Sequence, residues 1–130
     1  MSTTLSHSFD DPQLFPALTR ASDDDLNLLE FGVIGFGPDG VVGVYNDYES
    51  KCAGLSADRV KGHPLFTVVA PCMNNFLVAQ RFEDAAATGQ PLDVTIDYVL
   101  TLRMRPVKVK LRLLAGPASA MRYVLVLRRI

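Results

Sequence analysis

Apolar and β-branched residues gather in five short runs, separated by clusters of glycine, proline and polar residues. The first two runs are Leu29 to Ile34 and Val41 to Tyr45. Between them stands Gly37-Pro38-Asp39-Gly40, a sequence rich in turn formers, so the pair predicts a hairpin. Three later runs have the same character and predict further strands: Leu92 to Met104, Val107 to Leu114 and Met121 to Leu127.

The segments between these strands carry helical signals. Residues 46–61 are mixed and polar, which favours one or two short helices. Asn74 or Asn75 can cap a longer helix from Phe76 to Thr88, which Gly89-Gln90-Pro91 would end. The order of elements predicts an α+β fold, an antiparallel sheet with helices over one face and a cavity between them.

The N-terminal region differs from the rest in composition. Residues 1–28 are polar and interrupted by Pro12 and Pro16, and Ser22 can cap a short helix that reaches Leu29. We therefore expect residues 1–28 to form a cap segment and residues 29–130 to form one core domain.

Composition narrows the class of protein. The chain has 130 residues, 48% of them apolar, with 13 basic and 14 acidic side chains and a net charge of −1. These values predict one globular domain and argue against an overall basic nucleic-acid binder. The start lacks a secretory signal pattern, and the uncharged stretch 62–80 contains too many polar residues and prolines for a membrane span. We expect a cytoplasmic protein, a monomer or weak homodimer, without nucleic-acid or membrane partners.

Charge is distributed unevenly along the chain. All the acidic residues lie at or before Asp97, and every charged residue after it is basic. Lys108, Lys110 and Arg112 alternate with apolar residues, which is typical of a strand with one solvated face. That interpretation is favoured over a site for an anionic partner.

The hairpin region also contains a nucleotide-binding pattern. Gly35-Phe36-Gly37-Pro38-Asp39-Gly40 matches G-x-G-x-x-G, but a dinucleotide site needs a helix to begin at the last glycine. The residues that follow are strand formers, so the sequence predicts a turn and no nucleotide site.

The two cysteines, Cys52 and Cys72, are too few for a disulfide scaffold and lack the spacing of a zinc site. Cys72 directly follows Ala70-Pro71, and the proline fixes the backbone before the thiol. A thiol held this way suits covalent attachment, and a buried structural cysteine is the alternative. A cysteine hydrolase with His63 as base is a further alternative, although no orienting partner for His63 is evident.

Tyr45 and Glu49 are four positions apart and share a face if a helix begins at Tyr45. A phenol and a carboxyl group kept protonated by burial can both donate hydrogen bonds to one anionic oxygen. The pair is a candidate anion clamp, and a solvated glutamate beside a tyrosine at the sheet edge is the alternative.

Four fragments together resemble one family: Tyr45-Asn46-x-x-Glu49, Val69-Ala70-Pro71-Cys72, Asp97-Tyr98 and Met104-x-Pro106-x-Lys108-Val109-Lys110. The chain is similar to photoactive yellow proteins, blue-light receptors with a thioester-linked 4-hydroxycinnamoyl (p-coumaric acid) chromophore. The likeness extends from about Leu28 to the C-terminus. It implies a PAS-like, five-stranded antiparallel sheet with short helices on one face and an N-terminal helical cap.

The resemblance also implies a role for each matching residue. Cys72 would carry the thioester, with its backbone amide on the thioester carbonyl, and Tyr45 and Glu49 would hold the phenolate. Met104 would lie over the ring, and wall residues would be Phe66, Val69 and Phe76. Photoisomerisation would be followed by proton transfer from Glu49 and partial unfolding, with residues 1–28 as reporter to an unknown downstream signalling protein. No enzymatic activity is expected.

Three positions depart from the family pattern. Ala53 and Leu55 stand where the family usually has a threonine and an arginine near the clamp, and Leu102 stands in place of a tyrosine. These departures affect the expected colour and kinetics. Ala53 and Leu55 also support the alternative of a pigment-free PAS-like sensory or dimerisation module.

Overall fold

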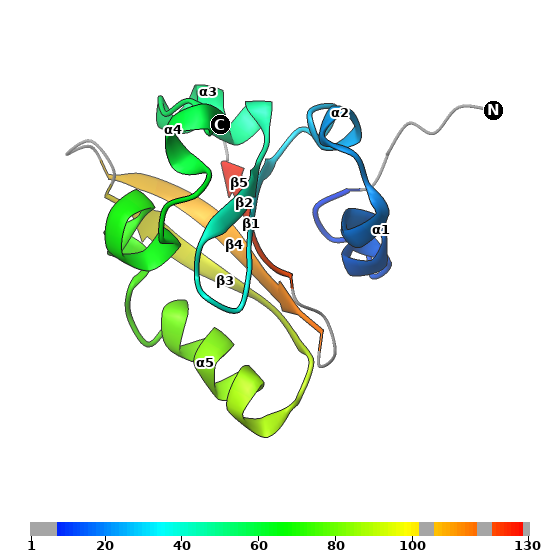
Figure 1. Ribbon diagram of the computed structural model, residues 1–130, viewed down its shortest axis with the longest axis vertical. Coiled ribbons are helices and arrows are strands. Elements are labelled where there is room, and N and C mark those ends of the chain that lie inside the picture. Colours follow the sequence, from blue (N-terminus) through cyan, green and yellow to red (C-terminus); the bar gives the residue numbers. More distant parts are fainter. Residues whose placement is uncertain (1–7, 102–105, 117–120, 129–130) are drawn as a thin grey trace.

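A five-stranded antiparallel sheet forms the centre of the computed structural model, which describes residues 8–101, 106–116 and 121–128 (Figure 1). Its strand order is β2-β1-β5-β4-β3. The strands are β1 (Gly32–Phe36), β2 (Val42–Tyr45), β3 (Leu92–Leu100), β4 (Val107–Ala115) and β5 (Arg122–Arg128). The predicted α+β fold with a five-stranded antiparallel sheet is confirmed.

The glycine-rich segment between β1 and β2 is a tight turn. The amide of Gly40 donates to the carbonyl of Gly37 over 2.9 Å, and Gly40 has a φ of +81°, which favours glycine. Strand β2 begins at Val42, so no helix follows the last glycine. The G-x-G-x-x-G pattern belongs to a hairpin, as predicted.

Short helices surround the sheet. The α-helices are α1 (Leu14–Arg20), α2 (Asp23–Leu26), α3 (Asp47–Ala53), α4 (Ala57–Val60) and α5 (Ala79–Thr88). A π-helical turn, η1 (Leu65–Val69), and a 3₁₀ turn, η2 (Pro71–Met73), join α4 to α5. No helix within the described ranges is both long and apolar enough to cross a membrane.

Several predicted boundaries were wrong. Helix α5 begins at Ala79 and not at Phe76, because Asn75 Oδ1 accepts the amides of Leu77 and Val78 and holds them in a turn before the helix. Strand β1 starts at Gly32, three residues later than predicted, and β3 ends at Leu100. Met104 lies outside the described residues.

The N-terminal region contains more helix than the sequence predicted. Pro16 was interpreted as a break but lies in the first turn of α1, where its missing N–H costs no hydrogen bond. Ser22 caps α2 as predicted, in a reciprocal capping box with Asp25, but the helix ends at Leu26.

Two apolar clusters lie on opposite faces of the sheet. The inner cluster packs α4, α5 and the η turns against the sheet through residues such as Phe36, Phe82 and Val126. The outer cluster packs α1 and α2 through Leu14 and Leu18 against Leu125 and its neighbours. Figure 1 shows α1 and α2 on one side of the sheet and α4 and α5 on the other. The N-terminal segment is therefore a lid over the outer face.

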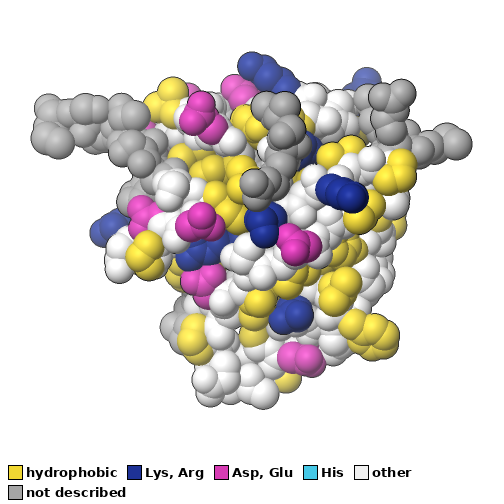
Figure 2. Space-filling view, turned by 180° about the vertical axis from the view of Figure 1, so that it is seen from behind, with side chains coloured by type: hydrophobic (Ala, Val, Ile, Leu, Met, Phe, Trp, Pro, Cys, Tyr) yellow, Lys and Arg dark blue, Asp and Glu magenta, His cyan; other side chains and the backbone are white. Residues whose placement is uncertain are grey.

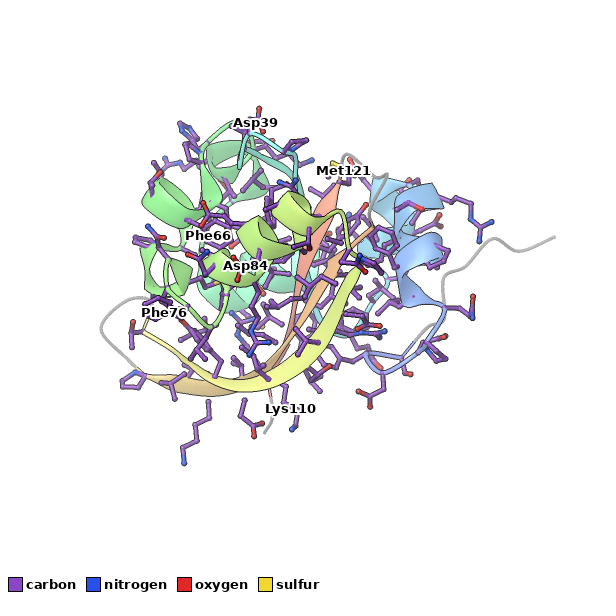
Figure 3. The ribbon with its side chains drawn as sticks, turned by 90° about the horizontal axis from the view of Figure 1, so that it is seen from below. Asp39, Phe66, Phe76, Asp84, Lys110 and Met121 are labelled. Carbon is purple, nitrogen blue, oxygen red and sulfur yellow. The ribbon has the colours of Figure 1, made fainter. Side chains whose placement is uncertain are left out.

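Arg112 corrects the prediction of a fully solvated strand face. It is only 4% exposed, because the N-terminal segment covers that part of β4. Its guanidinium binds both carboxylate oxygens of Asp93 over 2.9 Å and donates to the carbonyls of Phe9 and Asp11 over 2.8 Å. Lys110, two residues earlier on the same face of β4, lies beyond the N-terminal segment and projects towards solvent (Figure 3). Arg112 thus fastens the N-terminal segment to the sheet.

The uneven charge along the chain is partly compensated in the fold. Basic residues of the C-terminal part pair with earlier acidic residues: Lys110 with Asp97, Arg112 with Asp93 and Arg128 with Glu49. On the face that Figure 2 shows, basic and acidic side chains lie interspersed. Antiparallel pairing of β3, β4 and β5 brings the two halves together.

Replacing Arg112 by methionine should release the N-terminal segment. We expect the free energy of unfolding to fall by about 2 kcal/mol, because charge-assisted hydrogen bonds to buried backbone carbonyls are lost. Amide hydrogen exchange over residues 8–21 should accelerate. Chemical denaturation and exchange mass spectrometry measure the two effects.

Lys110→Met is the matched control on the same strand. It removes an exposed ion pair, so the free energy of unfolding should change by less than about 0.5 kcal/mol, with no faster exchange near the N-terminus. Equal behaviour of the two variants would contradict the anchoring role of Arg112.

Candidate functional site

Tyr45 ends strand β2 and lies in the inner apolar cluster. Its side chain is buried, and its pKa is raised above the usual value, first by burial and then by the nearby charge of Glu49. Burial disfavours a tyrosinate, so Tyr45 is a neutral phenol whose O–H is available to donate a hydrogen bond.

Asn46 positions the residues around Tyr45. It is 2% exposed and caps α3, with its Oδ1 accepting the amides of Val33 (2.9 Å) and Glu49 (3.1 Å). Its Nδ2 donates to the carbonyls of Leu26 and Phe31, each over 3.0 Å. One side chain thus joins the end of α2, the start of β1 and the first turn of α3.

Glu49 lies in that first turn of α3, one of the most deeply buried polar side chains at 1% exposure. Its carboxylate forms a bidentate ion pair with Arg128 at the end of β5, with Nη1–Oε1 at 2.7 Å and Nη2–Oε2 at 3.0 Å. From the sequence we expected a buried Glu49 kept protonated, with no cation beside it. A guanidinium in direct contact stabilises the ionised form of a carboxyl group.

Arg128 shows the same balance from the other side. Burial lowers its pKa, but the hydrogen bonds and charge of Glu49 raise it by more, so the net pKa is raised. The pair is therefore a true ion pair in a poorly solvated place. The sequence contained a signal for it, since the alternation of β5 puts Arg128 on the same face as Val124 and Val126, where an apolar residue is the norm.

Cys72 lies in the η2 turn, where Pro71 occupies the first position as the sequence suggested. Its thiol is free and half-buried, and the side chain packs against the inner cluster. The other cysteine, Cys52, is free and exposed. The fold therefore gives the two thiols different environments.

The backbone of Cys72 is held by the side chains of Tyr98 and Asn75, neither of which was assigned to the site from the sequence. The Tyr98 hydroxyl donates to the Cys72 carbonyl over 2.5 Å, and Asn75 Nδ2 donates to the same carbonyl over 3.2 Å. Asn75 Nδ2 also donates to the Tyr98 oxygen over 2.6 Å. The alternation of β3 puts Tyr98 on the inner face, and this pattern could have indicated from the sequence that its hydroxyl lies near the site. A surface hollow of about 1010 Å³ adjoins this pair along β3.

The expected wall residues separate into two groups. Phe66 and Val69 pack against the inner cluster, and the Phe66 ring meets that of Phe36 edge-on at 5.4 Å. Phe76 does not fit the expectation, because it is 84% exposed in the turn before α5 and lies at the periphery (Figure 3). Met104 is outside the described residues, so its role stays a prediction.

Tyr45 and Cys72 both pack in the inner cluster. The charge of Glu49 acts on Tyr45, and Glu49 itself binds Arg128. Tyr98 binds the backbone of Cys72. His63 is exposed, and in the described part of the chain no side-chain hydrogen bond joins it to Cys72. No group of three or more metal-ligating side chains occurs in residues 8–101, 106–116 and 121–128. The arrangement therefore presents the free thiol of Cys72 and the buried phenol of Tyr45, and the described residues show no hydrogen-bonded pair of Cys72 and His63.

Comparison with known proteins gives sequence relatives. No family model matches the chain. It is 36% identical over 97 residues to photoactive yellow protein of Halochromatium salexigens, covering 75% of this chain and 77% of the relative. It is 31% identical, with the same coverage, to photoactive yellow protein of Rhodothalassium salexigens.

Solved structures agree with this result. The photoactive yellow protein domain of the sensor histidine kinase Ppr from Rhodospirillum centenum has a TM-score of 0.78 at 31% identity, covering 85% of this chain and 96% of that domain. The PAS domain of the quorum-sensing receptor RpfR from Cronobacter turicensis, solved with BDSF, has a TM-score of 0.60 at 13% identity, covering 78% of this chain and 96% of that domain. The second likeness shows the fold alone.

The role of Asn46 as an organiser can be tested by Asn46→Ala. Because four buried backbone groups lose their partner, we expect the free energy of unfolding to fall by about 3 kcal/mol in a urea titration. Asn74→Ala, at an exposed asparagine, should change it by less than about 0.5 kcal/mol. A loss at Asn46 no larger than that at Asn74 would contradict the organising role.

Proposed function

Because this chain belongs to the photoactive yellow protein family, we propose that it is a blue-light photoreceptor with a 4-hydroxycinnamoyl group linked as a thioester to Cys72. The single observation that carries the proposal is the free, half-buried Cys72 thiol packed on the same inner cluster as the buried phenol of Tyr45. The residues suit the group in two respects: Cys72 supplies a free thiol for the thioester, and the buried phenol of Tyr45 can donate a hydrogen bond to a phenolate.

Attachment uses the chemistry of the Cys72 thiol. As a thiolate, its sulfur attacks the acyl carbon of an activated 4-hydroxycinnamic acid, and the activating group leaves. Pro71 and the hydrogen bonds from Tyr98 and Asn75 fix the backbone on which the sulfur stands. A fixed backbone limits the positions that the attached group can take.

Tyr45 and Glu49 are proposed to hold the phenolate oxygen. Tyr45 donates its O–H, and Glu49 shares one proton with that oxygen. When bound, the chromophore absorbs blue light and isomerises about its double bond. Transfer of the shared proton from Glu49 would then create a full negative charge on a side chain that is 1% exposed and in contact with Arg128, and the change in its hydrogen bonds would perturb the packing around it.

The N-terminal segment is the proposed reporter, with residues 1–28 acting as a cap and residues 29–130 as the core. Asn46 binds the carbonyl of Leu26 at the end of α2 and the amide of Glu49, so a disturbance at Glu49 reaches the cap through one side chain. Loss of cap packing would expose the outer cluster to a downstream signalling protein.

A second candidate is a PAS-like sensory or dimerisation module without pigment. It is favoured by position 53, where a buried alanine supplies no hydrogen-bond donor to the clamp. The attachment experiment separates the two functions.

Incubation of the apoprotein with activated 4-hydroxycinnamic acid should raise its intact mass by one hydroxycinnamoyl unit and produce a visible absorption band. Cys72→Ala should abolish both signals, because no other thiol is held in the inner cluster. Mass spectrometry and absorption spectroscopy give the result.

Cys52→Ala is the matched control, since it removes the other, exposed cysteine and should leave the mass increase and the band unchanged. Labelling at Cys52 would overturn the assignment of Cys72. No labelling at all would favour the pigment-free module.

A further inference from the structure

The ion pair between Glu49 and Arg128 is a feature that the proposed function does not require. Both nitrogens of the guanidinium fork meet both oxygens of the carboxylate, at 2.7 and 3.0 Å. The side chains are 1% exposed for Glu49 and 15% exposed for Arg128. An ion pair this buried is costly to form without good geometry, so its geometry has to be supported by the surrounding fold.

Gly32 on β1 provides that support. It pairs with Val126 on β5, which puts Arg128 two residues further along the strand and on the same inner face. A Cβ atom at position 32 would lie 2.0 Å from Glu49 Oε1 and 3.0 Å from its Cδ. The missing side chain of Gly32 therefore leaves the space in which the carboxylate lies.

Among the described residues, the groups that act on Arg128 through their charge are Glu49, Cys52 and Tyr45, and Glu49 is the one that contacts it. Tyr45, the other residue of the clamp, is a neutral phenol in these surroundings. Arg128 thus contacts Glu49, whereas it acts on Tyr45 through its charge, which partly offsets the rise that burial causes in the pKa of that phenol.

We infer that Arg128 is a positioning residue of the chromophore site, which holds Glu49 as a carboxylate and thereby sets where the proton shared by Glu49 and the pigment resides. The inference rests on the proposed function. It gives the site a cation supplied by β5, whereas position 55, where the family resemblance implies an arginine, carries Leu55.

Glu49 and the phenol oxygen of the pigment share one proton, which gives two forms of the site. With the proton on Glu49, the pigment is a phenolate that absorbs at longer wavelength and Glu49 can donate after isomerisation. With the proton on the pigment, Glu49 is a carboxylate paired to Arg128, and the pigment is a phenol that absorbs at shorter wavelength. Because Arg128 contacts Glu49 itself, it favours the second form. Arg128 therefore limits the fraction of molecules able to signal by transfer from Glu49.

The test compares absorption spectra of the pigment-loaded full chain and its Arg128→Gln variant at one neutral pH. Without the cation, the buried Glu49 takes up the proton, so the ratio of the phenolate band to the phenol band should rise about tenfold. Arg128→Lys keeps the charge and should give a ratio closer to that of the original chain. An unchanged or lower ratio in Arg128→Gln would overturn the inference.

Two controls separate this role from a structural one. Arg122→Gln changes an arginine at the other end of β5 and should leave the ratio unchanged. On a Glu49→Gln background, Arg128→Gln should shift the ratio by much less than tenfold, because Arg128 acts through Glu49. A full shift on that background would show that Arg128 acts on the pigment directly and would refute the inference.

A measurement on the apoprotein keeps the outcome independent of pigment binding. Infrared difference spectra against Glu49→Gln should reveal a carboxylate band from Glu49 in the original chain and a protonated-carboxyl band in Arg128→Gln. A protonated Glu49 in the original apoprotein would overturn the inference even if pigment attaches. The expected bands without pigment attachment would support the ion pair while refuting the proposed function.

Discussion

The buried amide of Asn46 is the constraint on which the geometry of the site depends. Its four hydrogen bonds reach the end of α2, the start of β1 and the first turn of α3. A single buried side chain thus supplies hydrogen bonds to backbone groups of three separate elements. Tyr45 precedes this asparagine and Glu49 follows it by three residues, and both are positioned by it.

Electrostatics in the inner face follow from the burial that this packing produces. Tyr45 remains neutral because its surroundings disfavour the tyrosinate, while Glu49 forms a salt bridge with Arg128. A carboxylate without a partner at that depth would cost several kcal/mol. Any step that moves a proton to or from Glu49 therefore acts on the stability of the fold.

The outer face provides a second, separate layer. Arg112 fastens the N-terminal segment through the carbonyls of Phe9 and Asp11, and α1 and α2 cover an apolar cluster that would otherwise face solvent. The two layers share the central strands β1, β4 and β5, whose alternate residues face opposite sides. The residues around Tyr45 on the inner face and the N-terminal segment on the outer face therefore pack against the same strands.

The sequence by itself determined the elements whose signals are local. The five strands, the hairpin at Gly37 to Gly40, the Ser22 cap and the end of α5 at Gly89 depend on neighbouring residues, and the structure agrees with each. The family resemblance likewise rested on short motifs. The relatives confirm it, and the roles of Tyr45, Glu49 and Cys72 stay predictions.

The tertiary structure decided what depends on residues far apart in the chain. Arg128 meets Glu49 across 79 positions, and Arg112 meets Phe9 across 103, so alternation could place each arginine on a face but no local pattern could identify its partner. The burial of Arg112 required knowing which part of the sheet the N-terminal segment covers, and the exposure of Phe76 depended on a turn made by Asn75. Alternation assigns a side chain to a face of a strand, but only packing decides what covers that face and which charge it meets there.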